Sequence, residues 1–162
     1  MTESVQGSFL LPDEPVRFTP RDLDRLLLHC TLAGASDITI QSHLPAFAEI
    51  YGILHPVTAR SIPNHEVGDM LNAIYGPNGT TQIASGSDVD THYEVRPDRE
   101  SRYRFRVNAT GCQVQGHDGI QITIRTIPSM PPELSTLDLH DDLLKALSPQ
   151  QGAVVITGST GS

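Results

Sequence analysis

The chain has 162 residues, a formal net charge of −8 at pH 7 and a pI near 5.2. This negative charge argues against a dedicated binder of nucleic acids or anionic membranes, because such binding needs clustered cations. The length is sufficient for one domain, or for one domain and the first strand of another, and the pattern described below indicates one complete domain.

The N-terminus predicts neither an export signal nor a membrane span. It lacks a basic region, and the apolar patch of Phe9, Leu10 and Leu11 is too short for either purpose. Cys30 and Cys112 lie far apart and form no C-x-x-C pair, so reduced thiols are expected rather than a disulfide or a zinc site. We therefore expect a cytoplasmic protein.

The first helix is predicted shortly after the N-terminus. Residues 1–17 are rich in Pro, Ser and acidic residues without periodicity, which predicts a mobile extension, with order beginning at Phe18. Thr19 can cap a helix, Pro20 suits its first position, and Gly34 can end it. The residues at helical spacing on its apolar face are Leu23, Leu26, Leu27 and Cys30.

A strand and a hairpin are predicted next. Residues 37–41 have the alternation of a strand, and residues 46–51 and 53–57 are expected to form a hairpin that turns at Tyr51 and Gly52. Together with the strands predicted further along the chain, these segments indicate a sheet.

A second helix is predicted to be capped by Asn64 and to end before Gly76 and Pro77, which cannot continue it. Its apolar stripe comprises Val67, Met70, Leu71 and Ile74. Residues 78–87 are expected to form a loop or one short helical turn.

The rest of the chain predicts an antiparallel meander, a linker and a final strand. The three strands of the meander are expected at residues 89–95, 102–114 and 119–127. Residues 18–128 would form the domain, and residues 129–150 a linker that contains a short helix at 139–147. Residues 151–162 would begin a second domain, with a strand at 153–157. The order of elements predicts an α+β fold, with helices packed against an antiparallel sheet.

Arginine is concentrated at the start of the longest predicted strand. Because side chains alternate along a strand, Arg102, Arg104 and Arg106 are expected on one face, opposite Tyr103 and Phe105. Guanidinium groups bind phosphate and carboxylate oxygens with two hydrogen bonds each, so this face could capture an anion. The alternative is a solvated strand face whose arginines pair with nearby carboxylates.

Arg125 lies at the end of the last meander strand. A single arginine at such a place is more often an ion-pair partner than a ligand contact. Its position beside the predicted linker favours a functional role, because ligand sites favour domain interfaces.

Metal and hydrolase motifs are absent from the sequence. The seven His residues form no H-E-x-x-H motif and have no Cys partner at zinc spacing, and no G-x-S-x-G motif supports Ser/His/Asp catalysis. Single-strand nucleic-acid binding through Tyr103, Phe105 and the arginines is also disfavoured, because the aromatic and cationic side chains alternate to opposite faces.

The sequence ends with AVVITGSTGS, a β-favouring run followed by glycine and hydroxyl residues. This is how a Walker A loop, G-x-x-x-x-G-K-[ST], begins, and its backbone amides would bind phosphate. The candidate nucleotide-binding residues are Gly158, Ser159, Thr160, Gly161 and Ser162. Since the Walker A Lys is missing, the chain by itself is not expected to hydrolyse ATP.

Several stretches together resemble the PilT/VirB11-type secretion ATPases. They have the order and spacing of that family, and they comprise residues 35–40, 88–90, 104–108, 124–128 and 152–162. Residues 18–27 and 73–77 resemble more narrowly the DotB/TraJ branch, which serves Dot/Icm-type IVB secretion and conjugation. The resemblance covers about residues 16–162, so the chain is expected to be the first half of such an ATPase, ending within its P-loop.

The resemblance implies a PAS-like N-terminal domain and a following RecA-like ATPase domain, six copies of which form a ring. ATP and Mg²⁺ would bind between the two domains of the full-length protein, and Arg104, Arg106 and Arg125 would act catalytically on the phosphates. The ring would lie in the cytoplasm, against inner-membrane secretion machinery. No sequence-specific contact with nucleic acid is implied.

A different class of function stays open from the sequence. A free-standing PAS-like domain could sense a small ligand or act as an adaptor. A clustered aromatic pocket would favour that reading, whereas aromatic residues make up 5% of this chain and none of them is Trp.

Overall fold

The computed structural model describes residues 9–114, 116–128, 133, 136, 138–155, 157 and 158. The chain divides between residues 129 and 130 into a larger and a smaller compact unit. The larger unit holds the sheet and three helices, and the smaller unit holds one short helix.

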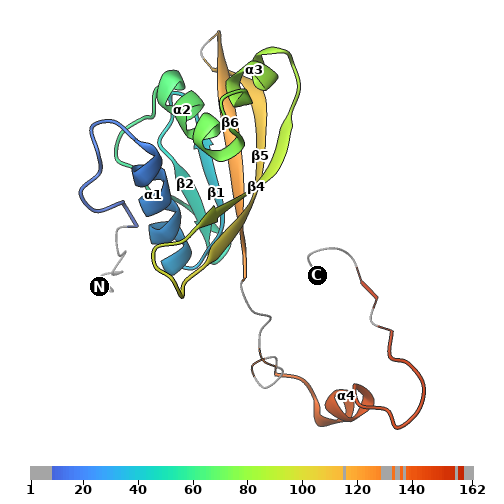
Figure 1. Ribbon diagram of the computed structural model, residues 1–162. Helices are drawn as coiled ribbons and strands as arrows, with labels where there is room; N and C mark the ends of the chain where they lie inside the picture. The colour runs from blue at the N-terminus through green and yellow to red at the C-terminus, as the bar shows by residue number, and fades with distance from the viewer. Residues whose placement is uncertain are drawn as a thin grey trace. The chain divides into compact units, whose positions relative to one another are not determined.

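The larger unit is built on a six-stranded antiparallel sheet in the order β3-β2-β1-β6-β5-β4 (Figure 1). The strands are β1 (Ala35–Gln41), β2 (Phe47–Ile50), β3 (Ile53–Pro56), β4 (Val89–Val95), β5 (Tyr103–Val114) and β6 (His117–Ile127). The predicted α+β class and the hairpin at Tyr51 and Gly52 are confirmed. The first strand lies beside the last, so that β1 pairs with β6 across 80 to 88 positions of sequence.

Helices α1 (Pro20–Leu32), α2 (Asn64–Tyr75) and α3 (Gly79–Ala84) lie along one face of this sheet (Figure 1). Thr19 caps α1 and Pro20 takes its first turn, as the sequence predicts, and Asp22 completes a reciprocal capping box with Thr19. The predicted apolar faces of α1 and α2 are buried in one continuous core with the inward residues of the strands.

The predicted cap of α2 needs correction. Pro63 occupies the N-cap, and Asn64 is the first helical residue. The Asn64 side chain does not cap the helix, because its Oδ1 accepts a hydrogen bond from the Ser42 hydroxyl at 2.8 Å. The helix ends where Gly76 adopts a φ of 113°, a conformation that favours glycine.

Part of the predicted extension, residues 9–17, contacts the domain. Leu11 is buried, and its amide donates to the Val57 carbonyl at 2.8 Å. The Glu14 carboxylate accepts from the Ala59 amide at 2.5 Å. The described order therefore begins before Phe18. The segment has no helical or strand periodicity of its own, but its hydrogen bonds to the domain and the burial of Leu11 hold it in place.

The smaller unit contains α4 (Asp141–Ala146), within the predicted helical range 139–147. The strand predicted at 153–157 is wrong for residues 153–155 and 157, which the structure describes as irregular. Val155 is 80% exposed. An apolar parallel strand is stable only between partners that bond its backbone and cover both faces, and no described residue pairs with this segment.

Candidate functional site

The arginines of β5 lie on the sheet face opposite the helices. Arg104 and Arg106 are exposed. Phe105, which lies between them, and Val107, which follows Arg106, are fully buried in the core. The predicted alternation is thereby confirmed. Arg102 departs from the expectation, because β5 begins at Tyr103 and Arg102 precedes the strand.

Arg125 joins the two β5 arginines through the pairing of β5 with β6. Arg125 lies directly opposite Arg106, and Arg104 lies opposite Ile127 two residues further along β6. The side chains of Arg106 and Arg125 are 72% and 70% exposed. Three guanidinium groups from segments about twenty residues apart are thus brought onto one surface, which we call the arginine face and define as Arg104, Arg106 and Arg125.

Carboxylates flank the arginine face. The Nε atom of Arg125 donates to Oδ1 of Asp37 on β1 at 2.9 Å, and Nη2 of Arg106 lies 3.8 Å from Oδ1 of Asp90 on β4. The guanidinium of Arg104 has no hydrogen bond or ion pair among the described residues, although its backbone belongs to the sheet. These contacts leave most guanidinium donors directed to solvent, so the face retains capacity for an anion.

Glu94, the neighbour of Arg104 across β4 and β5, is occupied by other arginines. Arg96 and Arg102 both form ion pairs with its carboxylate. The hydrogen bond from Arg96 has the largest effect on the pKa of Glu94. Together with the hydrogen bond from Arg102, it holds this pKa below its ordinary value. Glu94 therefore stays ionised but is shared between two partners other than Arg104.

The predicted phosphate-binding residues belong to the smaller unit. Gly158 is exposed and lies in neither a helix nor a strand. The other four, Ser159, Thr160, Gly161 and Ser162, fall outside the described residues. Their role as the start of a phosphate-binding loop stays a prediction.

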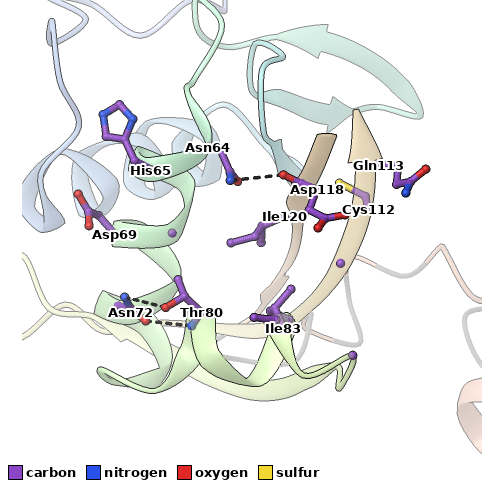
Figure 2. Close-up of a pocket in the computed structure, with 15 residues that line it drawn as sticks. Asn64, His65, Asp69, Asn72, Thr80, Ile83, Cys112, Gln113, Asp118 and Ile120 are labelled. Atoms are coloured by element: carbon purple, nitrogen blue, oxygen red, sulfur yellow. Dashed lines mark hydrogen bonds between the residues drawn. The ribbon is translucent and has the colours of Figure 1, made fainter. Parts of the chain in front are cut away.

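A second feature, which the sequence patterns did not predict, is a pocket of about 710 Å³ between α2, α3 and the end of the β5–β6 hairpin (Figure 2). A glycine inside the second helix, Gly68, is the feature of the sequence from which a close approach of α3 to α2 could have been predicted. A Cβ at Gly68 would come within 3.1 Å of Cγ2 of Thr80, so glycine inside α2 allows α3 to pack close by. Cys112 lines this pocket, and partial burial raises the pKa of its thiol.

The described residues include neither a membrane-spanning helix nor a cluster of metal ligands. None of their helices has the length and apolar character needed to cross a membrane. Nor do they contain a group of three or more His, Cys, Asp or Glu side chains placed to hold a metal ion.

The fold and much of the sequence are shared with solved ATPases. The chain is 60% identical to the Legionella pneumophila ATPase DotB, with a TM-score of 0.88 over 94% of this chain and 41% of that one. It is 26% identical to the Yersinia pseudotuberculosis ATPase DotB, with a TM-score of 0.76 over 84% of this chain and 37% of that one.

Two PilT proteins are more distant relatives. The pilus retraction motor PilT is 23% identical with a TM-score of 0.61 over 86% of this chain and 39% of that one, a likeness that bears on the fold alone. The type IV pilus retraction ATPase PilT of Pseudomonas aeruginosa is 25% identical over 141 residues, which are 87% of this chain and 39% of the relative.

No family model matches the chain. The chain spans about two fifths of the length of the relatives it matches. The arginine-bearing stretches that resemble secretion ATPases in sequence lie on the sheet of a domain whose fold those ATPases share. The chain thus belongs with the PilT/VirB11-type ATPases of the DotB kind, and it corresponds to their N-terminal part.

Proposed function

We propose that this chain is the N-terminal domain of a hexameric ATPase that powers type IVB, Dot/Icm-like, secretion or the related conjugative transfer. The observation that supports this most strongly is the 60% identity to the Legionella pneumophila ATPase DotB across 94% of the chain. The ring would work in the cytoplasm against inner-membrane secretion machinery. We assign the sheet with helices on one face to the PAS-like class.

In this proposal the arginine face acts on nucleotide that binds between this domain and a following RecA-like domain. Arg104, Arg106 and Arg125 would supply hydrogen-bond donors to the phosphate oxygens. Their exposure and their common face support this role, because a phosphate approaching the sheet could meet several guanidinium groups at once.

The residues present fit the phosphate part of ATP. Guanidinium donors such as those of the arginine face are groups that bind phosphate oxygens in proteins. Mg²⁺, when bound with ATP, would neutralise charge on the β- and γ-phosphate oxygens. The part of this chain would be to orient the phosphates and to stabilise negative charge that develops during hydrolysis.

The proposal is tested in the longer protein that joins this domain to its ATPase domain. Purified protein should hydrolyse ATP and form hexamers in sedimentation. In the source organism, deletion of the gene should abolish transfer of protein or DNA, and the intact gene should restore it. Wild-type transfer after the deletion would contradict the proposal.

A charge-matched pair of variants tests the role of the arginine face separately from the family assignment. Arg125→Ala should impair hydrolysis while the hexamer persists. Arg21→Ala, an exposed arginine of α1 on the helical side of the sheet, should leave hydrolysis unchanged. Equal rates for both variants would remove the arginine face from the mechanism but leave the family assignment intact.

A further inference from the structure

The pocket between α2, α3 and the β5–β6 hairpin is not used by the proposed ATPase role. It is lined from the helical side of the sheet, whereas the arginine face lies on the other side. Its volume of about 710 Å³ falls within the range of ligand-binding clefts, which is roughly 300–1,000 Å³. A cleft of this size has room for a side chain together with parts of its neighbours.

Two carboxylate residues are among those that line this pocket. Asp118 belongs to β6 and lies beside Ile120, whereas Asp69 belongs to α2 and its carboxylate points away from Ile120 (Figure 2). The side chain of Asp118 has no hydrogen bond or ion pair among the described residues. None of the residues that line the pocket is Lys or Arg.

Asp69 already has a cationic partner that does not line this pocket. Nη2 of Arg17 donates to Oδ2 of Asp69 at 2.9 Å, with both side chains more than half exposed. The carboxylate that is left for a ligand of the pocket is therefore that of Asp118.

The floor of the pocket is apolar. Ile83 of α3 and Ile120 of β6 are 8% and 7% exposed, and both side chains are directed toward the cavity (Figure 2). The Asp118 carboxylate beside an apolar floor suits a long aliphatic chain that ends in a cation, because its stem can pack while its charge stays near solvent. The same lining disfavours phosphate, which would meet a carboxylate and neither Lys nor Arg.

We propose that this pocket binds an arginine side chain presented by a segment of a partner protein. The guanidinium pairs with Asp118, and its stem packs on Ile83 and Ile120. Arginine fits better than lysine, because a guanidinium is planar, weakly hydrated and binds a carboxylate with two hydrogen bonds. The amide of Gln113 and the ring of His65 line the same pocket and can bond the backbone of the segment.

The test uses the full 162-residue chain and the peptide acetyl-Ala-Ala-Arg-Ala-Ala-amide, followed by amide NMR spectra. Saturable shifts are expected in α2 and in the β5–β6 hairpin. Peptides with norleucine or Glu in place of Arg should bind about fivefold more weakly, which is the upper end for an exposed ion pair. Asp118→Asn should weaken the Arg peptide by a similar factor.

Glu100→Gln is the matched control, since Glu100 is an exposed carboxylate in the loop before β5, at the far end of that strand from the pocket. It should bind the Arg peptide like the wild type. The proposal is overturned if no pocket amide shifts up to about 10 mM peptide, a concentration that detects Kd values in the millimolar range. It is also overturned if the Glu peptide binds as well, or if Asp118→Asn has no effect.

Comparison with the small cation agmatine tests whether the ligand of the pocket is a protein segment. Agmatine carries a guanidinium on an aliphatic chain without flanking peptide. Tighter binding of the peptide than of agmatine supports a protein partner, whereas equal binding contradicts that part of the proposal.

Discussion

Arg106 and Arg125 lie directly opposite each other on adjacent antiparallel strands, β5 and β6. Side chains so placed have Cβ atoms about 4.5–5.5 Å apart, and like charges there repel. Asp90 and Asp37 stand beside the two arginines and reduce that repulsion. An anion above the strands would reduce it further, which is the physical basis for the role we propose for this face.

Removal of one arginine from the face should slow turnover more than it weakens nucleotide binding. In the longer protein with its ATPase domain, Arg104→Ala or Arg125→Ala should reduce ATP hydrolysis by at least about tenfold, or ~1.4 kcal/mol of barrier. A contact that strengthens in the transition state raises the rate without comparable ground-state affinity. Steady-state hydrolysis and ADP titration measure the two effects.

The expected loss is small for an arginine finger, whose contribution is roughly 10³–10⁵ in rate, because three residues share the role. Arg102→Ala is the nearby comparison, since Arg102 precedes the strand and pairs with Glu94. If all of these variants hydrolyse ATP at the wild-type rate, the arginine face is only a solvated strand surface.

Asp37→Asn should destabilise the domain modestly and in a salt-dependent manner. The Asp37 side chain is 21% exposed and that of Arg125 is 70% exposed, so the pair is worth no more than about 1 kcal/mol. The loss in unfolding free energy should shrink in about 1 M NaCl, where the Debye length is near 3 Å. Urea unfolding at low and high salt measures it, and an equal loss at both would indicate that packing, rather than charge, is affected.

Glu66→Gln should cause the larger loss of stability. Glu66 is 3% exposed, and its Oε2 accepts from Nη2 of Arg60 at 2.6 Å and from the Phe18 amide at 2.9 Å. Loss of a charged partner from such a buried pair costs about 2–4 kcal/mol. The matched variant Asp69→Asn, on the same helix but with an exposed pair, should cost under about 0.5 kcal/mol. Similar losses for the two would contradict this account.

The same carboxylate should make stability depend on pH. Burial acts to raise the pKa of Glu66, but hydrogen bonds from Arg60 and the Phe18 amide outweigh it and hold the pKa below its ordinary value of 4.5. Its contribution is therefore fully present above pH 4.5 and is lost as the pH falls through the lower folded value. Unfolding free energies between neutral and acidic pH should fall less steeply for Glu66→Gln than for the wild type.

The smaller unit should be readily cleaved in the native protein. Lys145, the one lysine in the sequence, lies in α4, a helix of six residues that buries none of them. So short a helix is marginally stable without packing. Endoproteinase Lys-C should cut after Lys145 nearly as fast in native protein as in urea-unfolded protein, as followed by mass spectrometry. Strong native protection of Lys145 would contradict this prediction.

The elements that depend on neighbours in sequence could be predicted from the sequence itself. Helix α1 follows from the cap at Thr19, from Pro20 at the first position and from leucines at helical spacing, all within one segment. The exposure of Arg104 and Arg106 follows from strand alternation in the same way. These features are local, so no distant contact was needed to decide them.

Tertiary structure alone decided which distant residues meet. The alternation of a strand says which face a side chain occupies but not which strand lies beside it, so the pairing of Arg125 with Asp37 across 88 positions was beyond the pattern. The contact between Phe18 and Glu66 likewise places the N-terminal segment against α2. The run at residues 153–155 has the composition of a buried strand and forms none, because a strand exists only where another strand bonds its backbone.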